Sequence, residues 1–181
     1  MGIPTKILLH SCCAPCSLQF VKALNEEKIL PDLHWYNPNI HPFTEYRSRR
    51  DSLQEFAGKA GLSLVMEDEY GLRVFVKEVE LNTKPSFRCV FCYRLRLEKT
   101  AALAAEKGYD AFSATLLISP YQDHELIREI GEELSAVYGV EFFYRDFRPR
   151  FRQGQKEARE AGYYMQKYCG CIYSEEERYL S

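Results

Sequence analysis

The sequence predicts an α/β fold in which a parallel sheet of about five strands lies between two layers of helices, as a single domain over residues 1–181. Three observations support this prediction. Short apolar runs alternate with longer segments of helical periodicity, no repeat or linker-like stretch interrupts them, and 181 residues with 46% apolar side chains suit one globular domain. In such folds ligands bind beyond the carboxyl ends of the strands, near the reversal of strand order.

Each element follows from a local pattern. Strands are predicted at residues 6–11, 33–36, 62–66, 109–118 and 141–147, and helices at residues 14–28, 44–60, 88–107 and 126–138. Pro15 suits a first helical turn, and Gly108 and Gly139 are typical of the residue that follows a helix. Residues 71–80 fit an amphipathic helix, although their valines also tolerate a strand, and residues 148–168 indicate a basic loop followed by a last helix.

Composition excludes a membrane protein. No window approaches the roughly 18 consecutive apolar residues that span a bilayer, and the N-terminus lacks the apolar core and cleavage site of a secretory signal. We therefore expect a cytoplasmic protein without a membrane partner. The formal net charge of -2 leaves a nucleic-acid partner open, because a local basic face binds phosphate whatever the total charge.

The seven cysteines are the strongest functional signal. Thiols in the cytoplasm stay reduced, so these cysteines indicate metal binding or redox chemistry rather than structural disulfides. They form three groups: Cys12, Cys13 and Cys16; Cys89 and Cys92; Cys169 and Cys171.

Two of these groups adjoin helix N-termini, where free N–H groups and the helix dipole favour thiolates. Cys12 and Cys13 follow the first strand, and Cys89 and Cys92 form a CxxC motif at the head of a helix. Four such thiolates fit tetrahedral zinc and a [4Fe-4S] cluster equally well on geometry. The cluster is favoured, because a chain with this much apolar sequence needs no zinc to fold. The competing interpretations are buried thiols in a turn and a structural CxxC.

Catalytic candidates follow from two further features. One glycine separates Cys169 from Cys171, a spacing that permits a strained and readily reduced disulfide; the alternative is a surface turn with two idle thiols. Asp123 lies just beyond the fourth predicted strand and is a candidate proton donor, because that loop opens toward the expected cleft.

Basic and aromatic side chains alternate in two segments, residues 46–50 and 144–152. Their arginines could contact an RNA backbone and their rings could stack on a base. A solvated helix face and a charged strand end explain the two segments equally well. His10, His41 and His124 are ambiguous, since a lone histidine is more often a hydrogen-bonded structural residue than an acid or a ligand.

Five separated motifs carry a family resemblance. They are HSCCAPCS at residues 10–17, YNPNIHP at residues 36–42, RCVFCYRLRL at residues 88–97, SATLLISPYQDHE at residues 113–125 and KYCGC at residues 167–171. Together they hold all seven cysteines and span almost the whole chain. In this order they resemble the QueH family of epoxyqueuosine reductases.

The resemblance implies an adenine-nucleotide-hydrolase-like fold of the HUP or PP-loop type. It implies reductive removal of the epoxide oxygen from epoxyqueuosine at the wobble position of tRNA, with an electron donor that is not identified. The implied [4Fe-4S] ligands are Cys12, Cys13, Cys89 and Cys92, and Cys169 and Cys171 are implied to be a redox-active disulfide. Cys16 is a spare thiol that either binds an additional iron ion or packs in the core.

These roles are chemically coherent. A cluster delivers one electron at a time, so a dithiol can serve as the second reservoir for a two-electron deoxygenation. The leaving oxygen also needs a proton or a Lewis acid, which Asp123 or an open iron site could provide.

Two other functions use the same residues. One is a non-catalytic, zinc-stabilised RNA-binding module. The other is a sulfur-transferring tRNA enzyme, but such enzymes pair their cluster with a Gly-Ser-rich ATP-binding loop, whereas residues 11–17 read SCCAPCS.

Overall fold

A parallel five-stranded sheet with the order β3-β2-β1-β4-β5 forms the centre of the protein. The structure is a computed structural model that describes residues 4–180. The strands are β1 (Ile7–His10), β2 (Asp32–Trp35), β3 (Leu64–Met66), β4 (Ala111–Ala114) and β5 (Glu141–Phe142). Every neighbouring pair is parallel, which confirms the predicted sheet.

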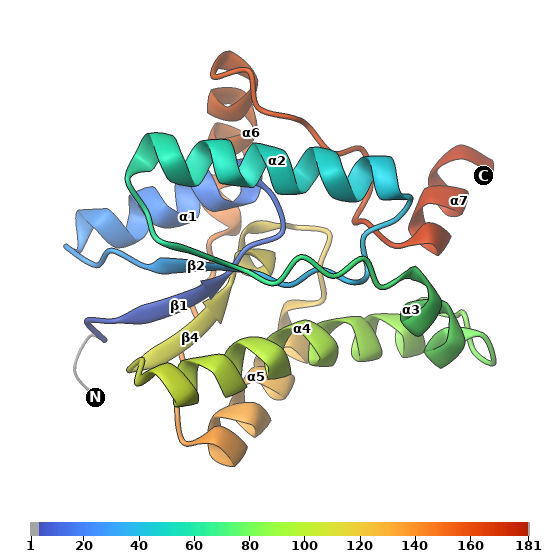
Figure 1. Cartoon of the computed structure of the whole chain (residues 1–181), viewed down its shortest axis with the longest axis horizontal. Helices are drawn as coiled ribbons and strands as arrows, with labels where there is room; N and C mark the ends of the chain where they lie inside the picture. Colours follow the sequence, from blue (N-terminus) through green and yellow to red (C-terminus); the bar gives the residue numbers. More distant parts are fainter. Residues whose placement is uncertain (1–3, 181) are drawn as a thin grey trace.

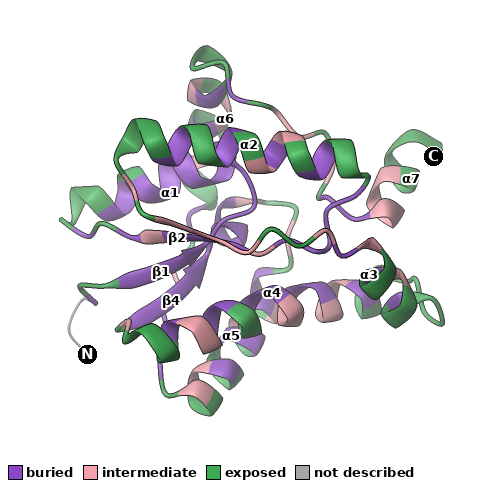
Figure 2. Cartoon of the chain, viewed as in Figure 1, coloured by how far each residue is buried: buried purple, intermediate pink, exposed green. Residues whose placement is uncertain are grey.

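Helices cover both faces of the sheet. One face carries α1 (Ala14–Glu26) and α2 (Phe43–Ala60), with α6 (Phe151–Glu160) packed on α1; the other carries α4 (Pro85–Lys107) and α5 (His124–Tyr138) (Figure 1). All residues of the two central strands β1 and β4 are buried as a result (Figure 2). Within residues 4–180, no helix is both long and apolar enough to cross a membrane.

The strand order reverses between β1 and β4. From β1 the chain moves outward to β2 and β3, then returns to β4 and continues to β5 on the opposite side. The loops that leave β1 and β4 therefore separate, and they open a crevice at the carboxyl edge of the sheet. Two short helices, α3 (Leu72–Val79) and α7 (Ile172–Leu180), lie beyond this edge (Figure 1).

Several boundaries differ from the predictions. The strand predicted at residues 109–118 ends at Ala114, and the apolar residues Thr115–Ile118 form a buried 3-10 turn, η1. Local sequence does not separate these conformations, because both bury the same side chains. The last strand is shorter than predicted, and α7 was not predicted because it has no fully buried residue to create a pattern.

The close approach of α5 to β5 yields a stability prediction. A Cβ atom at Gly131 would lie 2.2 Å from Cδ1 of the buried Phe142, so Gly131→Ala should lower the free energy of unfolding by about 1–3 kcal/mol, despite the better helix propensity of alanine. Gly58→Ala in α2 is the matched control, because no atom lies within 4 Å of its added Cβ. It should raise the stability by about 0.5–1 kcal/mol. Chemical denaturation measures both, and a Gly131→Ala variant as stable as Gly58→Ala would refute the contact.

Candidate functional site

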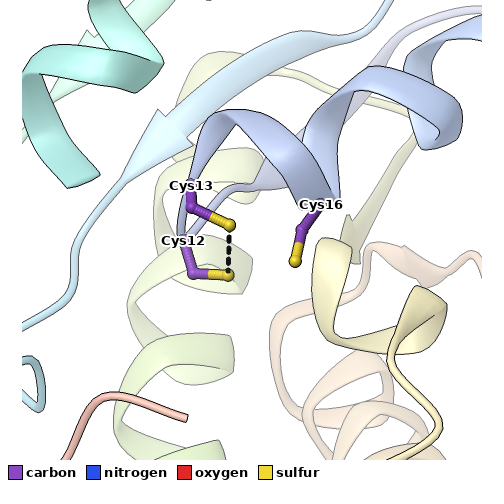
Figure 3. Close-up of side chains that lie close together, drawn as sticks. All are labelled: Cys12, Cys13 and Cys16. Atoms are coloured by element: carbon purple, nitrogen blue, oxygen red, sulfur yellow. Dashed lines mark hydrogen bonds between the residues drawn. The ribbon is translucent and has the colours of Figure 1, made fainter. Parts of the chain in front are cut away.

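Three buried thiols meet where β1 passes into α1. The sulfur atoms of Cys12, Cys13 and Cys16 all lie within 4.8 Å of one another, and those of Cys12 and Cys13 are 3.8 Å apart (Figure 3). Cys13 is the extended residue that precedes α1, and Cys16 lies one helical turn further on, so both side chains face the same side. We call these residues the thiol trio. Within residues 4–180, they are the only cluster of three or more potential metal-ligating side chains at this spacing.

The trio favours a single negative charge on Cys12. Hydrogen bonds with the Cys13 and Cys16 thiols, assisted by the positive charge of Arg49, hold the pKa of Cys12 well below its usual value. Burial raises the pKa of Cys13, and hydrogen bonding to Cys12 raises that of Cys16. A thiolate is the form that binds metal, so Cys12 is available as a ligand directly. A bound cation would compensate the negative charge of Cys13 and Cys16, and would so favour their thiolate forms as well.

His10, at the end of β1, is a neutral structural residue. Burial lowers the pKa of its imidazole to about 3. Its Nε2 atom lies 3.0 Å from the carbonyl oxygen of Tyr36. These contacts give His10 a structural role at the strand end.

The second cysteine group lies on α4. Cys92 is buried and Cys89 is half-buried. Cys92 packs with Phe75, Val79 and Cys171 in a small apolar cluster apart from the main core. Cys12 and Cys13 are in the trio, which Cys16 completes, and Cys89 and Cys92 lie on α4.

The third group combines an exposed thiol with a buried one. Cys169 is exposed, whereas Cys171 is buried at the start of α7, where the N–H of Ser174 donates to its sulfur over 3.4 Å. A hydrogen bond from Cys171 lowers the pKa of Cys169 to about 5, and the same interaction raises the pKa of Cys171. The pair thus presents a thiolate to solvent with a protonated thiol behind it.

A buried arginine holds this pair against α2. Arg49 donates to the carbonyl oxygens of Tyr168 over 2.9 Å and Cys169 over 3.1 Å, and it forms an ion pair with Glu45 at 2.6 Å. Gly170 has a φ of +133°, a region that side chains rarely adopt, and its carbonyl accepts the His41 N–H over 2.8 Å. The position of Cys169 is therefore fixed by the protein interior.

A cleft of about 1210 Å³ joins the trio to the C-terminal pair, because Cys12, Cys16 and Cys169 all line it. Six cationic side chains also line the cleft: Arg49, Arg148, Arg152, Arg159, Lys167 and Arg178. Among the described lining residues none carries a carboxylate. Tyr121 and Phe151, whose ring centroids are 5.8 Å apart, add aromatic surface. The cleft is suited to a polyanion with planar bases.

The arginines of the two basic segments have different surroundings. Arg50 pairs with Asp68, Arg145 with Glu27, and Arg150 with Glu26, all outside the cleft lining. Arg49, Arg148 and Arg152 line the cleft, and Arg148 also forms an ion pair with Asp146 at 2.6 Å. The sequence analysis did not identify three further cations that line the same cleft. They lie outside the two alternating segments and are Arg159, Lys167 and Arg178.

Asp123 caps α5. Its carboxylate accepts the N–H of Leu126 over 3.1 Å, and its side chain is exposed. The neighbouring Gln122 lines the cleft, whereas Asp123 is not among the lining residues. His124 is buried, with Nε2 3.1 Å from the carbonyl oxygen of Ser119.

Comparison with solved structures concerns the fold. A crystal structure described as a predicted subunit of tRNA methyltransferase from Methanocaldococcus jannaschii aligns over 90% of this chain and 93% of its own, at a TM-score of 0.55 and 12% identity. At this identity the likeness shows the fold alone. Together with the strand order, it confirms the predicted adenine-nucleotide-hydrolase-like α/β class.

Sequence comparison gives the family. A family model described as Epoxyqueuosine reductase QueH matches residues 7–177. A protein named Epoxyqueuosine reductase QueH from Dehalococcoides mccartyi is 40% identical over 174 residues, which cover 96% of this chain and 94% of that protein. A protein of the same name from Thermotoga maritima is 35% identical over 180 residues, which cover 95% and 91%. The chain therefore belongs to the QueH family of epoxyqueuosine reductases, which are oxidoreductases.

Proposed function

We propose that this chain reduces epoxyqueuosine to queuosine at the wobble position of tRNA, in the cytoplasm and within one catalytic domain of residues 1–181. One observation carries the proposal: Cys12 and Cys16 of the thiol trio line the same cationic cleft as Cys169. Redox-capable thiols and a surface for a polyanion thus meet at one place. This is the combination that a reductase acting on tRNA requires, and the names of the relatives support it.

The Cys169–Cys171 pair can supply the electrons that the reaction consumes. Removal of the epoxide oxygen breaks both of its C–O bonds, forms the double bond of the cyclopentene and releases water, which consumes two electrons and two protons. With Cys169 already a thiolate, oxidation of the pair breaks the one S–H bond of Cys171, forms one S–S bond, and supplies two electrons and one proton; the second proton comes from solvent. An external electron donor then reduces the disulfide. The position of Cys169 supports this role, because the residue is exposed and lines the cleft.

We assign Cys12, Cys13, Cys89 and Cys92 to a [4Fe-4S] cluster and Cys16 to an additional iron ion. When bound, such a cluster supplies single electrons. The trio fits iron, because a cation at these sulfurs, which lie within 4.8 Å of one another, would offset the burial and mutual repulsion that disfavour thiolates at Cys13 and Cys16. Cys16 lines the cleft, which favours a ligand role over that of a core side chain.

Asp123 is the proposed proton donor to the leaving oxygen. Its place directly after the cleft residue Gln122 supports the proposal. Its carboxylate accepts the N–H of Leu126, and a proton donor at this position must also reach the cleft.

The cluster assignment predicts the metal content of variants. Replacing Cys12, Cys13, Cys89 or Cys92 by Ala should remove most of the iron and the broad visible absorption of sulfur-to-iron charge transfer, because each loss opens a coordination position. Iron analysis and spectra of anaerobically purified protein measure this.

Cys16→Ala and Ser17→Ala are the matched controls in the same turn. Cys16→Ala should keep the cluster spectrum and lose only the additional iron, whereas Ser17→Ala should keep both. Full iron content after the loss of any one proposed ligand would remove that residue from the set, and zinc in place of iron would contradict the cluster.

The cationic cleft predicts salt-dependent tRNA binding. The double variant Arg152→Gln/Arg159→Gln should weaken tRNA binding and reduce the salt slope by about 2, since each lost phosphate contact changes that slope by about 1. Binding measured at several salt concentrations gives the slope. The control is Arg145→Gln/Arg150→Gln, whose arginines pair with Glu27 and Glu26 away from the cleft lining. Equal slopes for both double variants would show that the cleft does not hold the RNA backbone.

The redox role of the C-terminal pair gives a third prediction. Cys169→Ser and Cys171→Ser should each leave the cluster spectrum and tRNA affinity intact while turnover falls sharply, because the dithiol can no longer cycle. Activity assays run beside spectra and binding measurements test this. Loss of the cluster would identify the pair as ligands, and wild-type turnover in both variants would show idle thiols.

The low pKa of Cys169 provides an independent readout of the same pair. Alkylation of Cys169 should reach half its maximal rate near pH 5, because the thiolate is the reacting species. In Cys171→Ala the stabilising hydrogen bond is absent, so the midpoint should move upward toward the ordinary value of about 8.5.

A further inference from the structure

Arg96 on α4 is a buried cation without a carboxylate partner. Only 3% of the residue is exposed. Its Nε donates to the carbonyl oxygen of Cys92 over 3.0 Å, and its Nη2 donates to the sulfur of Cys92 over 3.1 Å. Throughout the described part of the chain, no aspartate or glutamate forms an ion pair with it.

The two other buried arginines each have the carboxylate partner that Arg96 lacks. Arg49 pairs with Glu45 and Arg88 pairs with Glu177, each at 2.6 Å. A buried charge without such a partner is costly, because the interior replaces none of the hydration that the charge loses. A neutral thiol at Cys92 accepts a hydrogen bond but supplies no opposite charge.

The negative charge available to Arg96 comes from cysteines of all three groups. Burial lowers the pKa of Arg96, and negative charge on Cys92, Cys12 and Cys169 raises it above its ordinary value. The guanidinium therefore lies within electrostatic reach of the thiol trio, the CxxC pair and the C-terminal pair. This is where an anionic group held by thiolates would be compensated.

We propose that Arg96 is the resident counter-charge of the thiolate-ligated iron–sulfur group, and a positioning residue that raises its reduction potential through the hydrogen bond to Cys92. The inference rests on the proposed function, because it assumes that this group is bound. The potential of such a group depends on its net charge and on hydrogen bonds to its sulfurs. A cation donating to a ligating sulfur stabilises the more negative, reduced form.

The proposal makes the metal-free and loaded proteins respond in opposite directions. In the metal-free protein Arg96 has no carboxylate partner and donates only to the sulfur and carbonyl oxygen of Cys92, so Arg96→Met should raise the melting temperature. In the loaded protein the same change removes a favourable charge pair. It should lower the reduction potential and speed the release of iron to a chelator by roughly 10-fold to 100-fold. Arg96→Lys retains the positive charge without the planar guanidinium group. Its reduction potential and its rate of iron release should therefore lie between those of wild type and Arg96→Met.

The experiment compares Arg96→Met and Arg96→Lys with Arg94→Met. Arg94 is the matched control, because it lies on the same helix, is more exposed and pairs with Glu133. Thermal unfolding of metal-free protein, iron release from reconstituted protein and spectroelectrochemical titration supply the three readouts. Arg94→Met should match wild type in iron release and potential.

The outcomes separate this inference from the proposed function. A wild-type chain that takes up no iron–sulfur group overturns both. A wild-type chain that binds the group, with Arg96→Met unchanged in potential and iron release, overturns the counter-charge and leaves the proposed function standing. A metal-free Arg96→Met protein that melts below wild type would show that Arg96 is a structural residue whose charge is already compensated.

Discussion

The site depends on one buried ion pair, that of Arg49 with Glu45. The pair is inside the protein, where breaking it would leave an unpaired charge at a cost of several kcal/mol. Arg49 uses its remaining donors to hold the carbonyl oxygens of Tyr168 and Cys169, far along the chain from α2. The tether acts beside the packing of Cys171 against Phe75 and the hydrogen bond from the His41 N–H to the Gly170 carbonyl. A buried charge–charge interaction thus fixes the backbone of Cys169, while apolar packing holds its neighbour Cys171.

Three buried arginines have three different tasks. Arg49 fixes the C-terminal cysteine loop, and Arg88 joins the head of α4 to α7 through Glu177. Arg96 instead donates to the sulfur of Cys92. The first two carry their own counter-charges, so their environments are complete in the folded chain. The third is completed only by a thiolate charge, which ties the stability of α4 to the state of the site.

Sequence patterns predicted the sheet and the cysteine grouping well, because both arise from local signals. The CCAPC turn after β1 and the glycines that end α4 and α5 are short-range features. The patterns placed Cys12, Cys13 and Cys16 in one group, but left open whether Cys16 binds iron or packs in the core. Cys16 follows Cys13 by three residues in α1, and this helical spacing was the signal available for placing it beside Cys13. The tasks of Arg49 and Arg96 could not be found, because they depend on contacts and burial that only the folded chain creates.

The placement of unpaired cations explains how a chain of net charge -2 could bind a polyanion. Arg145 and Arg150 are matched by Glu27 and Glu26, where their fields largely cancel. The cleft lining holds six cationic side chains, of which Arg49 and Arg148 pair with Glu45 and Asp146. The other four form no ion pair among the described residues, so their field is not cancelled locally. Charge separation over the surface, rather than total charge, therefore directs an anionic substrate toward the thiols. The same field would stabilise a negatively charged redox group at the base of the cleft, so substrate binding and cofactor retention would depend on the same cations.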